Sequence, residues 1–594
     1  MPVSSSLYRF KFFLFLLGWI LYLPTTGAGE LSTPKHPNIL LICVDDLRPE
    51  LGCYGAEHMQ TPNIDAFSES GVTFDRCYVQ VAVCNPSRAS MMTGIRPDRL
   101  GVWTLRIHFR EAMPDAVTLP QYLRQTGYTC EGYGKIFHNP WPDPRSWDQP
   151  HRWSPGGFTH YTAEQKAFAQ EVRESFPEGS WLRQNLRGLI TNAPEIEDTE
   201  HKDGGLTLLA VERLKALGKQ KKPFFLAVGY TLPHLAWCPP KRWWDRYDRE
   251  QLPLASNPFP PKDAPQVAVG TNYEPAYYAD MIDMPKPWEG SVSEETARRL
   301  RHGYFASISF IDSEIGKLLA ALDAEDRADD TIVVLWSDHG YKLGEHAGWS
   351  KMTNYEIDTR IPFIIRDPRS PSNGQRCDRL VETLDLFPTL CELAGVAMPE
   401  MVDGQSAAAL INDPEALHKG AAFTQFVRQQ MIGNAIRTDK WRYVEWRTLK
   451  EAELKHQELY DQQNDPDENK NVFGQHPEVE ADLQQRLCKV LVPHSISLIP
   501  PIRSKKGGKR VKVEWTNQHN GPVRVTWINP QGERKVLFDL PAGASRKNTT
   551  SVGHLFSMES KDGIYHENLE ITDTSKQLFL GKGADDELPT AKDQ

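Results

Sequence analysis

The chain has 594 residues, which is too long for one compact core and predicts two or three domains. Apolar residues make up 40% and charged residues 25%, a composition typical of globular proteins and not of disordered or fibrous ones. The net charge of −10 argues against a generally basic surface, so we expect no nucleic-acid partner, and any polyanion would have to bind in a local basic pocket.

The first 29 residues have the pattern of a secretory signal peptide. Arg9 and Lys11 supply the positive start, residues 12–23 form a short apolar run, and Thr26-Gly27-Ala28 offers a small-residue cleavage site. The apolar run is shorter than the roughly 20 residues of a membrane span, which makes an uncleaved anchor the less favoured alternative. We therefore predict an exported protein, periplasmic or secreted, with no stable membrane insertion.

Residues 38–44 form a continuous apolar run, the pattern of a strand buried on both faces. Asp45 and Asp46 follow directly at its carboxyl end, where open α/β sheets bind their ligands. Acidic residues are also common in turns and helix caps, so this pair alone leaves both interpretations open.

The most informative segment is 84–94, with the sequence CNPSRASMMTG. Cys84 has no second cysteine two to four residues away, so it is not half of a zinc knuckle. The spacing of the nine cysteines indicates no disulfide framework either, and we derive no pairing. A buried cysteine at the start of a helix is the structural alternative to a functional one.

Two further segments place basic side chains where a site could form. Lys135 and His138 follow Gly134, and a spacing of three lets both point the same way. Residues 224–230 predict a second buried strand, with His234 just beyond its carboxyl end. The stretch between them, about 140–200, is rich in Pro, Trp and charge with little periodicity, and we expect long loops that roof the pocket.

The next part of the chain predicts a long helix and a third buried strand. Apolar residues recur on one side of residues 294–322, the pattern of an amphipathic helix. Residues 331–336 then form an apolar run that ends in Ser337, Asp338 and His339, and Lys351 follows in a loop. Three apolar strands that each deliver acids or histidine at the carboxyl end are a pattern that chance rarely produces.

The pattern changes from about residue 421, where short strands precede a helix expected over 477–490. We predict a C-terminal subdomain over 421–495 and a linker, rich in Pro and basic residues, over 496–510. Alternating apolar residues then predict a small β-domain over 511–580. Trp515 and Trp527 lie at alternating strand positions, where an aromatic residue is more often part of the core than of a binding platform.

Segment 84–94 resembles the signature of the type I sulfatases, Cys-x-Pro-Ser-Arg-x-x-x-Leu-Thr-Gly, with Met92 where that family most often has Leu. In that family a dedicated maturase oxidises the cysteine to Cα-formylglycine, whose hydrate is the nucleophile. The resemblance therefore implies that Cys84 is modified in this way and that the maturase is a partner.

The resemblance covers about 30–490 and is nearest to the iduronate-2-sulfatase branch of that family, through the segments around Asp45, Cys84, Lys135, His234 and Asp338. It implies an α/β fold like that of alkaline phosphatase, with a mixed central sheet flanked by helices. The catalytic domain would span 30–420, and the C-terminal subdomain would be smaller and α+β.

The resemblance also implies a metal site and a set of catalytic residues. The ligands map onto Asp45, Asp46, modified Cys84, Asp338 and His339. Most sulfatases have Asn at the last of these positions, whereas the iduronate branch has His, as here. A carboxylate majority favours one hard divalent cation, Ca²⁺ or Mg²⁺, and we expect Ca²⁺, although His339 is an unusual ligand for it.

The same residue types suit the chemistry of a sulfate monoester, whose anionic oxygens repel a nucleophile. Arg88 would hold the nucleophile, while Lys135 and Lys351 would stabilise the transferring sulfuryl oxygens. His234 is expected to protonate the leaving sugar hydroxyl, and His138 to remove the proton whose loss releases sulfate. The two histidine roles could be interchanged.

The resemblance predicts a sulfuric ester hydrolase whose substrate is a sulfated carbohydrate, in particular the 2-O-sulfated uronic acids of a polysaccharide. Two alternatives stay open: a phosphonate or phosphodiester hydrolase of the same superfamily, and a non-catalytic carbohydrate-binding relative. The C-terminal β-domain has a weaker resemblance to the β-domain of the von Hippel–Lindau tumour suppressor, through 521–529, 540–543 and 550–556. That likeness implies a β-sandwich only, because a fold does not fix a function.

Overall fold

A computed structural model describes residues 36–491 and, beyond them, 508–519, 521–529, 534–560, 566–572 and 577–580. The predicted signal peptide and most of the predicted linker lie outside these residues. Among the helices that are described, none combines the length and the apolar character needed to cross a membrane.

The centre of the fold is a seven-stranded mixed sheet with the order β3-β4-β1-β5-β6-β2-β7. β3, β4, β1 and β5 are parallel, whereas β6 runs antiparallel to both of its neighbours. The strands are β1 (Asn38–Val44), β2 (Val72–Tyr78), β3 (Thr129–Gly134), β4 (Phe224–Tyr230), β5 (Thr331–Ser337), β6 (Arg360–Arg366) and β7 (Arg376–Glu382). β2 and β7 are parallel to each other, so β6 is the strand that runs against the other six. The predicted mixed sheet is confirmed, and the neighbouring strands β3, β4, β1 and β5 end at one edge.

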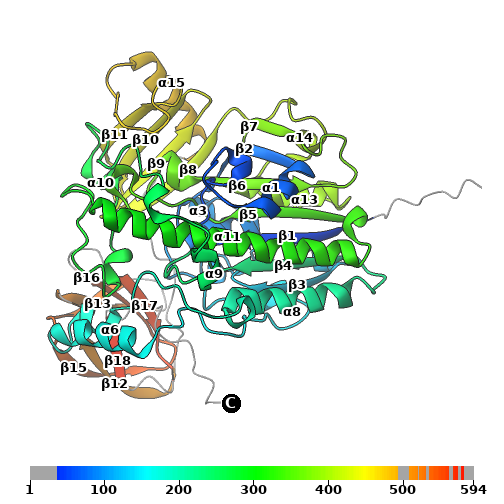
Figure 1. Ribbon diagram of the computed structural model, residues 1–594. Helices are drawn as coiled ribbons and strands as arrows, with labels where there is room; N and C mark the ends of the chain where they lie inside the picture. The colour runs from blue at the N-terminus through cyan, green and yellow to red at the C-terminus, as the bar shows by residue number, and fades with distance from the viewer. Residues whose placement is uncertain are drawn as a thin grey trace, which may run out of the picture. The chain divides into compact units, whose positions relative to one another are not determined.

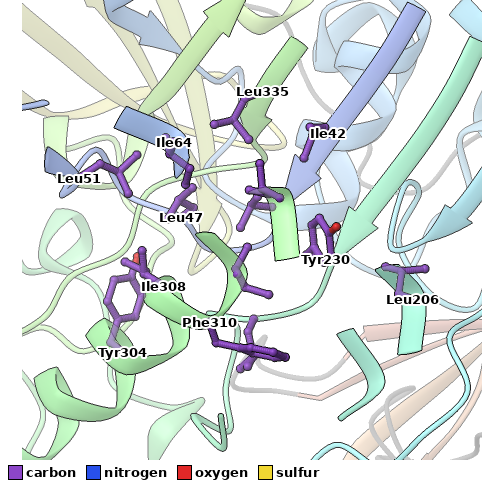
Figure 2. Packing of buried hydrophobic residues seen from close by; sticks show 14 of the residues in the cluster. Ile42, Leu47, Leu51, Ile64, Leu206, Tyr230, Tyr304, Ile308, Phe310 and Leu335 are labelled. Atoms are coloured by element: carbon purple, nitrogen blue, oxygen red, sulfur yellow. The ribbon is translucent and has the colours of Figure 1, made fainter. Parts of the chain in front are cut away.

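Helices cover both faces of this sheet, and β1 shows why its sequence is apolar throughout. Leu40, Ile42 and Val44 pack into one buried cluster, whereas Ile39 and Leu41 pack into another. The first cluster, part of which is shown in Figure 2, includes residues of α1 (Pro62–Glu69), α8 (Lys202–Leu217) and α11 (Glu294–Ala324). The second includes residues of α2 (Cys84–Thr93), α5 (Leu119–Gln125), α13 (Leu386–Leu393) and α14 (Ala408–Asn412). Figure 1 shows α8 and α11 along one face of the sheet.

The segment between β3 and α8 differs from the prediction of loops alone. It contains α6 (Ala163–Ser175) and α7 (Trp181–Asn185), so the prediction was wrong for these residues. Only Ala169 of α6 is buried, which explains the missing apolar stripe. The helix is instead begun by a capping box between Thr162 and Gln165, which satisfies backbone donors that a helix start leaves free.

Short helices connect the remaining segments of the catalytic region. They are α3 (Pro97–Leu100), α4 (Phe109–Ala112), α9 (Lys241–Trp244), α10 (Gln266–Val269) and α12 (Glu356–Thr359). A second sheet follows, antiparallel, with the order β11-β10-β9-β8. Its strands are β8 (Ala422–Arg428), β9 (Met431–Arg437), β10 (Trp441–Thr448) and β11 (Leu454–Asp461). Leu483 and Leu487 of α15 (Pro477–Val490) pack against its apolar side chains, as expected for a small α+β unit.

The C-terminal region forms two further sheets, with the orders β15-β12-β18 and β14-β13-β16-β17. The strands are β12 (Arg510–Asn517), β13 (Val523–Ile528), β14 (Arg534–Leu540), β15 (Ser545–Ser551), β16 (Leu555–Ser560), β17 (His566–Glu570) and β18 (Gln577–Leu580). Val513 and Trp515 of one sheet and Val525 and Met558 of the other belong to one buried cluster, the arrangement expected of a β-sandwich. Trp515 is fully buried and Trp527 is partly buried against the same cluster, so both take part in the core. The likeness to the von Hippel–Lindau β-domain stays a prediction.

Candidate active site

The carboxyl edge of the neighbouring parallel strands β3, β4, β1 and β5 gathers the residues that the sequence singled out. Asp45 and Asp46 follow β1, Lys135 and His138 follow β3, His234 follows β4, and Asp338 and His339 follow β5. Cys84 is the first residue of α2, Arg88 lies one turn further along, and Lys351 lies in the loop before α12. The expectation that strand ends would bring these residues together is therefore met by the topology.

Arg88 links the residues that come from three different strands. It is fully buried, and its guanidinium donates to Asp338 Oδ2 at 2.8 Å and to Asp45 Oδ1 at 3.0 Å. A third group, the carbonyl of Ile136, accepts at 3.1 Å. A planar guanidinium can serve such divergent acceptors at once, which an ammonium group cannot do with the same geometry. Arg88 therefore fixes the positions of both carboxylates relative to α2.

Lys135 reaches the site because two glycines let the ends of β3 and β4 approach closely. A Cβ atom on Gly229 would lie 2.2 Å from the Lys135 carbonyl oxygen, and one on Gly134 would lie 2.2 Å from the Gly229 carbonyl oxygen. Gly134 also has φ +71°, which side chains other than glycine rarely adopt. The Lys135 ammonium forms an ion pair with Asp45 and lies 4.0 Å from Cys84 Sγ.

Cys84 contacts His339 directly, with 3.2 Å between Sγ and Nε2. The other nitrogen of this ring, Nδ1, lies 3.0 Å from the Gly340 carbonyl oxygen, which fixes the orientation of the ring. Burial raises the pKa of the Cys84 thiol well above its ordinary value, although Lys135 acts in the opposite direction. An unmodified Cys84 thiol therefore stays protonated and is a weak nucleophile.

Lys351 meets a carboxylate that sequence reasoning missed. Its ammonium lies 2.8 Å from Asp46 Oδ2 and 2.8 Å from Glu274 Oε2, and Glu274 Oε1 lies 3.3 Å from His234 Nε2. Glu274 is 8% exposed, so it is a buried carboxylate between two predicted catalytic groups. It belongs to an irregular segment before the short 3₁₀ turn Pro275–Tyr277, where no periodicity marks a site residue.

The pKa values of the two histidines of the site are shifted in opposite directions. Burial, then Lys135 and Arg88, hold the pKa of His138 well below its ordinary value, so His138 is neutral. His138 Nδ1 is buried and has no hydrogen-bond partner among the residues described. Burial and Lys351 would also lower the pKa of His234, but Asp46 and Glu274 raise it overall. Groups whose pKa values are pushed apart in this way suit a base and an acid.

Part of the predicted metal site forms a compact ligand set. Ligand atoms of Asp45, Asp46, Cys84 and His339 all lie within 4.8 Å of one another. A calcium ion holds its ligands at about 2.3–2.6 Å, so atoms at this spacing can share one ion. Asp46 Oδ1 is buried without a hydrogen-bond partner in the described chain, with His339 Nε2 3.4 Å away. A buried carboxylate oxygen without a hydrogen-bond donor is suited to bind a cation.

Asp338, the remaining predicted ligand, lies beside this set. Its Oδ1 accepts from the Asp46 backbone N–H at 3.1 Å, and its Oδ2 accepts from Arg88 at 2.8 Å. Burial raises the pKa of Asp338, which Arg88 opposes and the nearby Asp45 carboxylate reinforces. A cation between the two carboxylates would relieve that repulsion.

A second residue missed from the sequence, Tyr304 of α11, fixes the turn that carries the acids. Its hydroxyl donates to the Asp46 carbonyl oxygen at 2.7 Å and accepts from the Arg48 backbone N–H at 3.0 Å. Arg48 is itself held by two contacts of 3.0 Å to the Glu345 carboxylate. Tyr304 lies within the amphipathic helix predicted over 294–322, and that pattern does not mark its hydroxyl as part of a site.

Comparison with known proteins identifies similar chains. The family profile described as Sulfatase matches residues 37–396, and the one described as N-sulphoglucosamine sulphohydrolase, C-terminal, matches 344–492. Iduronate 2-sulfatase of Mus musculus is 30% identical over 545 residues, which is 80% of this chain and 97% of that protein. Iduronate 2-sulfatase of Homo sapiens is 33% identical over 394 residues, 62% of this chain and 70% of that protein. A sulfatase of Formosa agariphila is 32% identical over 73% of this chain and 82% of its own length.

Solved structures share the fold at lower identity. One, of a protein in complex with its substrate D-glucosamine-2-N,6-O-disulfate, has a TM-score of 0.60 at 22% identity, covering 77% of this chain and 99% of that one. The phosphonate monoester hydrolase of Agrobacterium radiobacter has a TM-score of 0.59 at 22% identity, with 76% and 95% coverage. These likenesses support the predicted core, in which helices flank a mixed sheet.

Proposed function

Because the chain belongs to the sulfatase family, we propose that it removes sulfate from sulfated sugars by using a Cα-formylglycine made from Cys84. The observation that carries this proposal is the position of Cys84, which is buried at the first turn of α2. Its Sγ lies 3.2 Å from His339 and 4.0 Å from Lys135, and Lys135 pairs with Asp45, which Arg88 also contacts. A buried thiol with a raised pKa has no evident use there, whereas a modified side chain would meet a metal ligand set and basic groups.

The modification supplies what a sulfate ester requires of its attacking group. The hydrate of a formylglycine carries two hydroxyl groups, one to attack sulfur and a second whose deprotonation expels sulfate and restores the aldehyde. A formylglycine-generating maturase is therefore an expected partner of this chain. Serine at position 84 would lack the second hydroxyl and could not complete the cycle.

The basic side chains of the site would bind and stabilise the sulfuryl group. Lys135 and Lys351 contact different members of the acid pair, because Lys135 pairs with Asp45 and Lys351 pairs with Asp46. Each retains its charge, because the adjacent carboxylates outweigh the effect of burial and raise its pKa. Positive charge held in place before reaction stabilises the negative charge that develops on sulfuryl oxygens. Arg88 would act on the nucleophile side, through its contacts to Asp45 and Asp338.

His234 would protonate the oxygen of the leaving sugar, and His138 would remove the proton whose loss releases sulfate. The raised pKa of His234 and the lowered pKa of His138 support this assignment over the reverse one. A general acid must be protonated and a general base neutral at the operating pH.

The metal is proposed to be Ca²⁺, held by Asp45, Asp46, Asp338, His339 and the modified residue 84. Such an ion would screen the anionic sulfate oxygens and lower the pKa of the attacking hydroxyl. The carboxylates Asp45 and Asp46 in the ligand set support a hard cation over zinc.

The proposed substrate class is 2-O-sulfated uronic acid residues of a polysaccharide. The similarity to iduronate 2-sulfatases, at 30–33% identity, supports this class. The test is a panel of defined sulfated saccharides, with sulfate release measured for the matured protein and for Cys84→Ala. Preferred turnover of a 2-O-sulfated uronic acid would support the class, and preference for a 6-O-sulfated hexosamine would contradict it.

A second candidate is a phosphonate or phosphodiester hydrolase. It is suggested by the phosphonate monoester hydrolase of Agrobacterium radiobacter, whose fold is similar. Parallel assays with a phosphonate monoester and a phosphodiester decide between them. A higher kcat/KM for either phosphorus ester than for every sulfate ester would replace the sulfatase proposal. A carbohydrate-binding relative without activity is disfavoured, because every predicted catalytic position carries a suitable side chain.

We further propose that the protein is exported by its N-terminal segment. The C-terminal β-domain is proposed to have a structural or substrate-anchoring role, because no residue assigned to chemistry lies beyond Lys351.

A further inference from the structure

We propose that Glu274 is a positioning residue that holds His234 as a doubly protonated, oriented acid for the leaving group. This inference rests on the proposed role of His234 in sulfate ester hydrolysis. Glu274 is not one of the residues that motif comparison assigned, and it lies 40 residues along the chain from His234 by number.

The geometry places the Glu274 carboxylate between two basic groups. Oε2 lies 2.8 Å from Lys351 Nζ, whereas Oε1 lies 3.3 Å from His234 Nε2. Arg187 Nη1 lies 3.8 Å from Oε1, on the more exposed side. A carboxylate that is 8% exposed pays a desolvation cost, which only such charged neighbours can offset. The contacts thus account for its burial.

His234 has an oxygen acceptor at each ring nitrogen. Nδ1 lies 2.8 Å from the Leu235 carbonyl oxygen, and Nε2 faces Glu274 Oε1. A neutral imidazole carries one N–H and can donate to only one of these oxygens. Protonation of both nitrogens satisfies both acceptors, so this environment selects the imidazolium form. The 3.3 Å separation at Nε2 is longer than a strong charge-assisted hydrogen bond, which leaves that proton available to a substrate oxygen.

Other charged groups also affect the protonation of His234. The titratable groups that interact electrostatically with His234, besides Glu274, are Lys351, Lys135, His138, Asp45 and Asp46. Lys351 and Lys135 disfavour the imidazolium, and Asp46 favours it. Glu274 contacts both His234 and Lys351, but Lys351 has a second carboxylate, Asp46, 2.8 Å away. Loss of the Glu274 charge therefore leaves Lys351 paired with Asp46, whereas His234 loses the carboxylate that contacts its ring.

The consequence is a dependence on the leaving group. A sugar alkoxide is a poor leaving group and needs a proton, whereas 4-nitrophenolate leaves without one. General acid catalysis contributes about 10²–10⁴-fold where it is needed. Lys351 keeps its contact to Asp46 when Glu274 is neutralised, so the binding of the sulfuryl group, which both substrates share, should suffer less.

The test compares Glu274→Gln with the wild-type protein, both matured, on a sulfated uronic acid and on 4-nitrophenyl sulfate. We expect kcat/KM to fall about 100-fold for the sugar ester and less than about 10-fold for the aryl ester. The alkaline limb of the sugar profile should move to lower pH, and Glu274→Asp should restore part of the loss. Equal losses on both substrates with an unmoved alkaline limb would show a structural role and overturn the proposal.

Glu295→Gln is the matched control, because Glu295 is an exposed carboxylate in the first turn of α11. It should leave both substrates and the pH profile unchanged. A thermal melt of each variant checks that Glu274→Gln is folded at the assay temperature.

A second readout is independent of turnover. NMR titration of ¹³C-labelled histidine, with His234 assigned by His234→Gln, gives its pKa in wild type, Glu274→Gln and Glu295→Gln. We expect the pKa of His234 to fall by about one pH unit in Glu274→Gln, as for loss of an opposite charge within hydrogen-bonding range, and not in the control. An unchanged pKa would refute the role of Glu274. If wild-type protein released no sulfate from any ester while the pKa still fell, the proposed function would fail and the assignment of Glu274 to His234 would stand.

Discussion

Arg88 offers the sharpest test of how the site is held together. Replacement of Arg88 by Met removes a fully buried guanidinium that contacts Asp45 at 3.0 Å and Asp338 at 2.8 Å. Both carboxylates are also buried at 0% exposure, so water cannot take over the role of the lost partner. Removal of one member of a buried ion pair leaves an uncompensated charge and costs about 3–5 kcal/mol. We expect the upper part of this range, because Asp338 loses its guanidinium partner while Asp45 is left with Lys135 alone.

The control for Arg88→Met is Arg124→Met, which removes a partly exposed ion pair. Arg124 Nε lies 3.0 Å from Asp148, with side chains 32% and 34% exposed, and such pairs are worth less than about 1 kcal/mol. Urea unfolding, followed by tryptophan fluorescence in the presence of chelator, compares the two variants without a stabilising ion. Equal shifts of the unfolding midpoint for the two variants would refute the reasoning, as would an Arg88→Met protein as stable as wild type. Arg88→Lys should be intermediate, because it keeps the charge and loses the forked contacts.

Two further predictions concern the metal and the pH dependence. Chelation should abolish sulfate release, and Ca²⁺ or Mg²⁺ should restore it better than Zn²⁺. Asp46→Asn should weaken calcium binding measured by calorimetry. Two tightly bound zinc ions, found by elemental analysis, would contradict the proposed calcium site. The kcat/KM profile should be bell-shaped. Its acid limb should lie below the ordinary histidine range, because His138 has a lowered pKa and becomes protonated only at low pH. Its alkaline limb should lie above that range, because His234 has a raised pKa and loses its proton only at higher pH. His138→Gln should remove the acid limb, and His234→Gln should remove the alkaline limb. If each variant removed the other limb, the two histidine roles would be exchanged.

The sequence was sufficient for the strands that build the site. Runs such as 38–44 and 331–336 are apolar on both faces, and their position before acids indicated which sheet edge would carry chemistry. The motif around Cys84 indicated the family through its residue order, and this is independent of any packing detail. Elements whose identity depends on a local pattern were thus predictable.

Other features required the tertiary structure. Helix α6 has a single buried residue, so its apolar pattern is too weak to mark it as a helix. Glu274 gains its role only when an irregular segment brings it between Lys351 and His234. Tyr304 supports the Asp46 turn across 258 residues of sequence. Contacts of this kind depend on chain paths that no local pattern specifies.

The central claim is that residue 84 acts as a formylglycine and not as a thiol. The most direct measurement is mass spectrometry of the peptide that contains Cys84, made on samples with and without co-expressed maturase and paired with sulfate release by the same samples. We predict that activity rises in proportion to the fraction of residue 84 that has lost its thiol, and that Cys84→Ala and Cys84→Ser, both folded, release almost no sulfate. Full activity from protein whose Cys84 is unmodified would contradict the account.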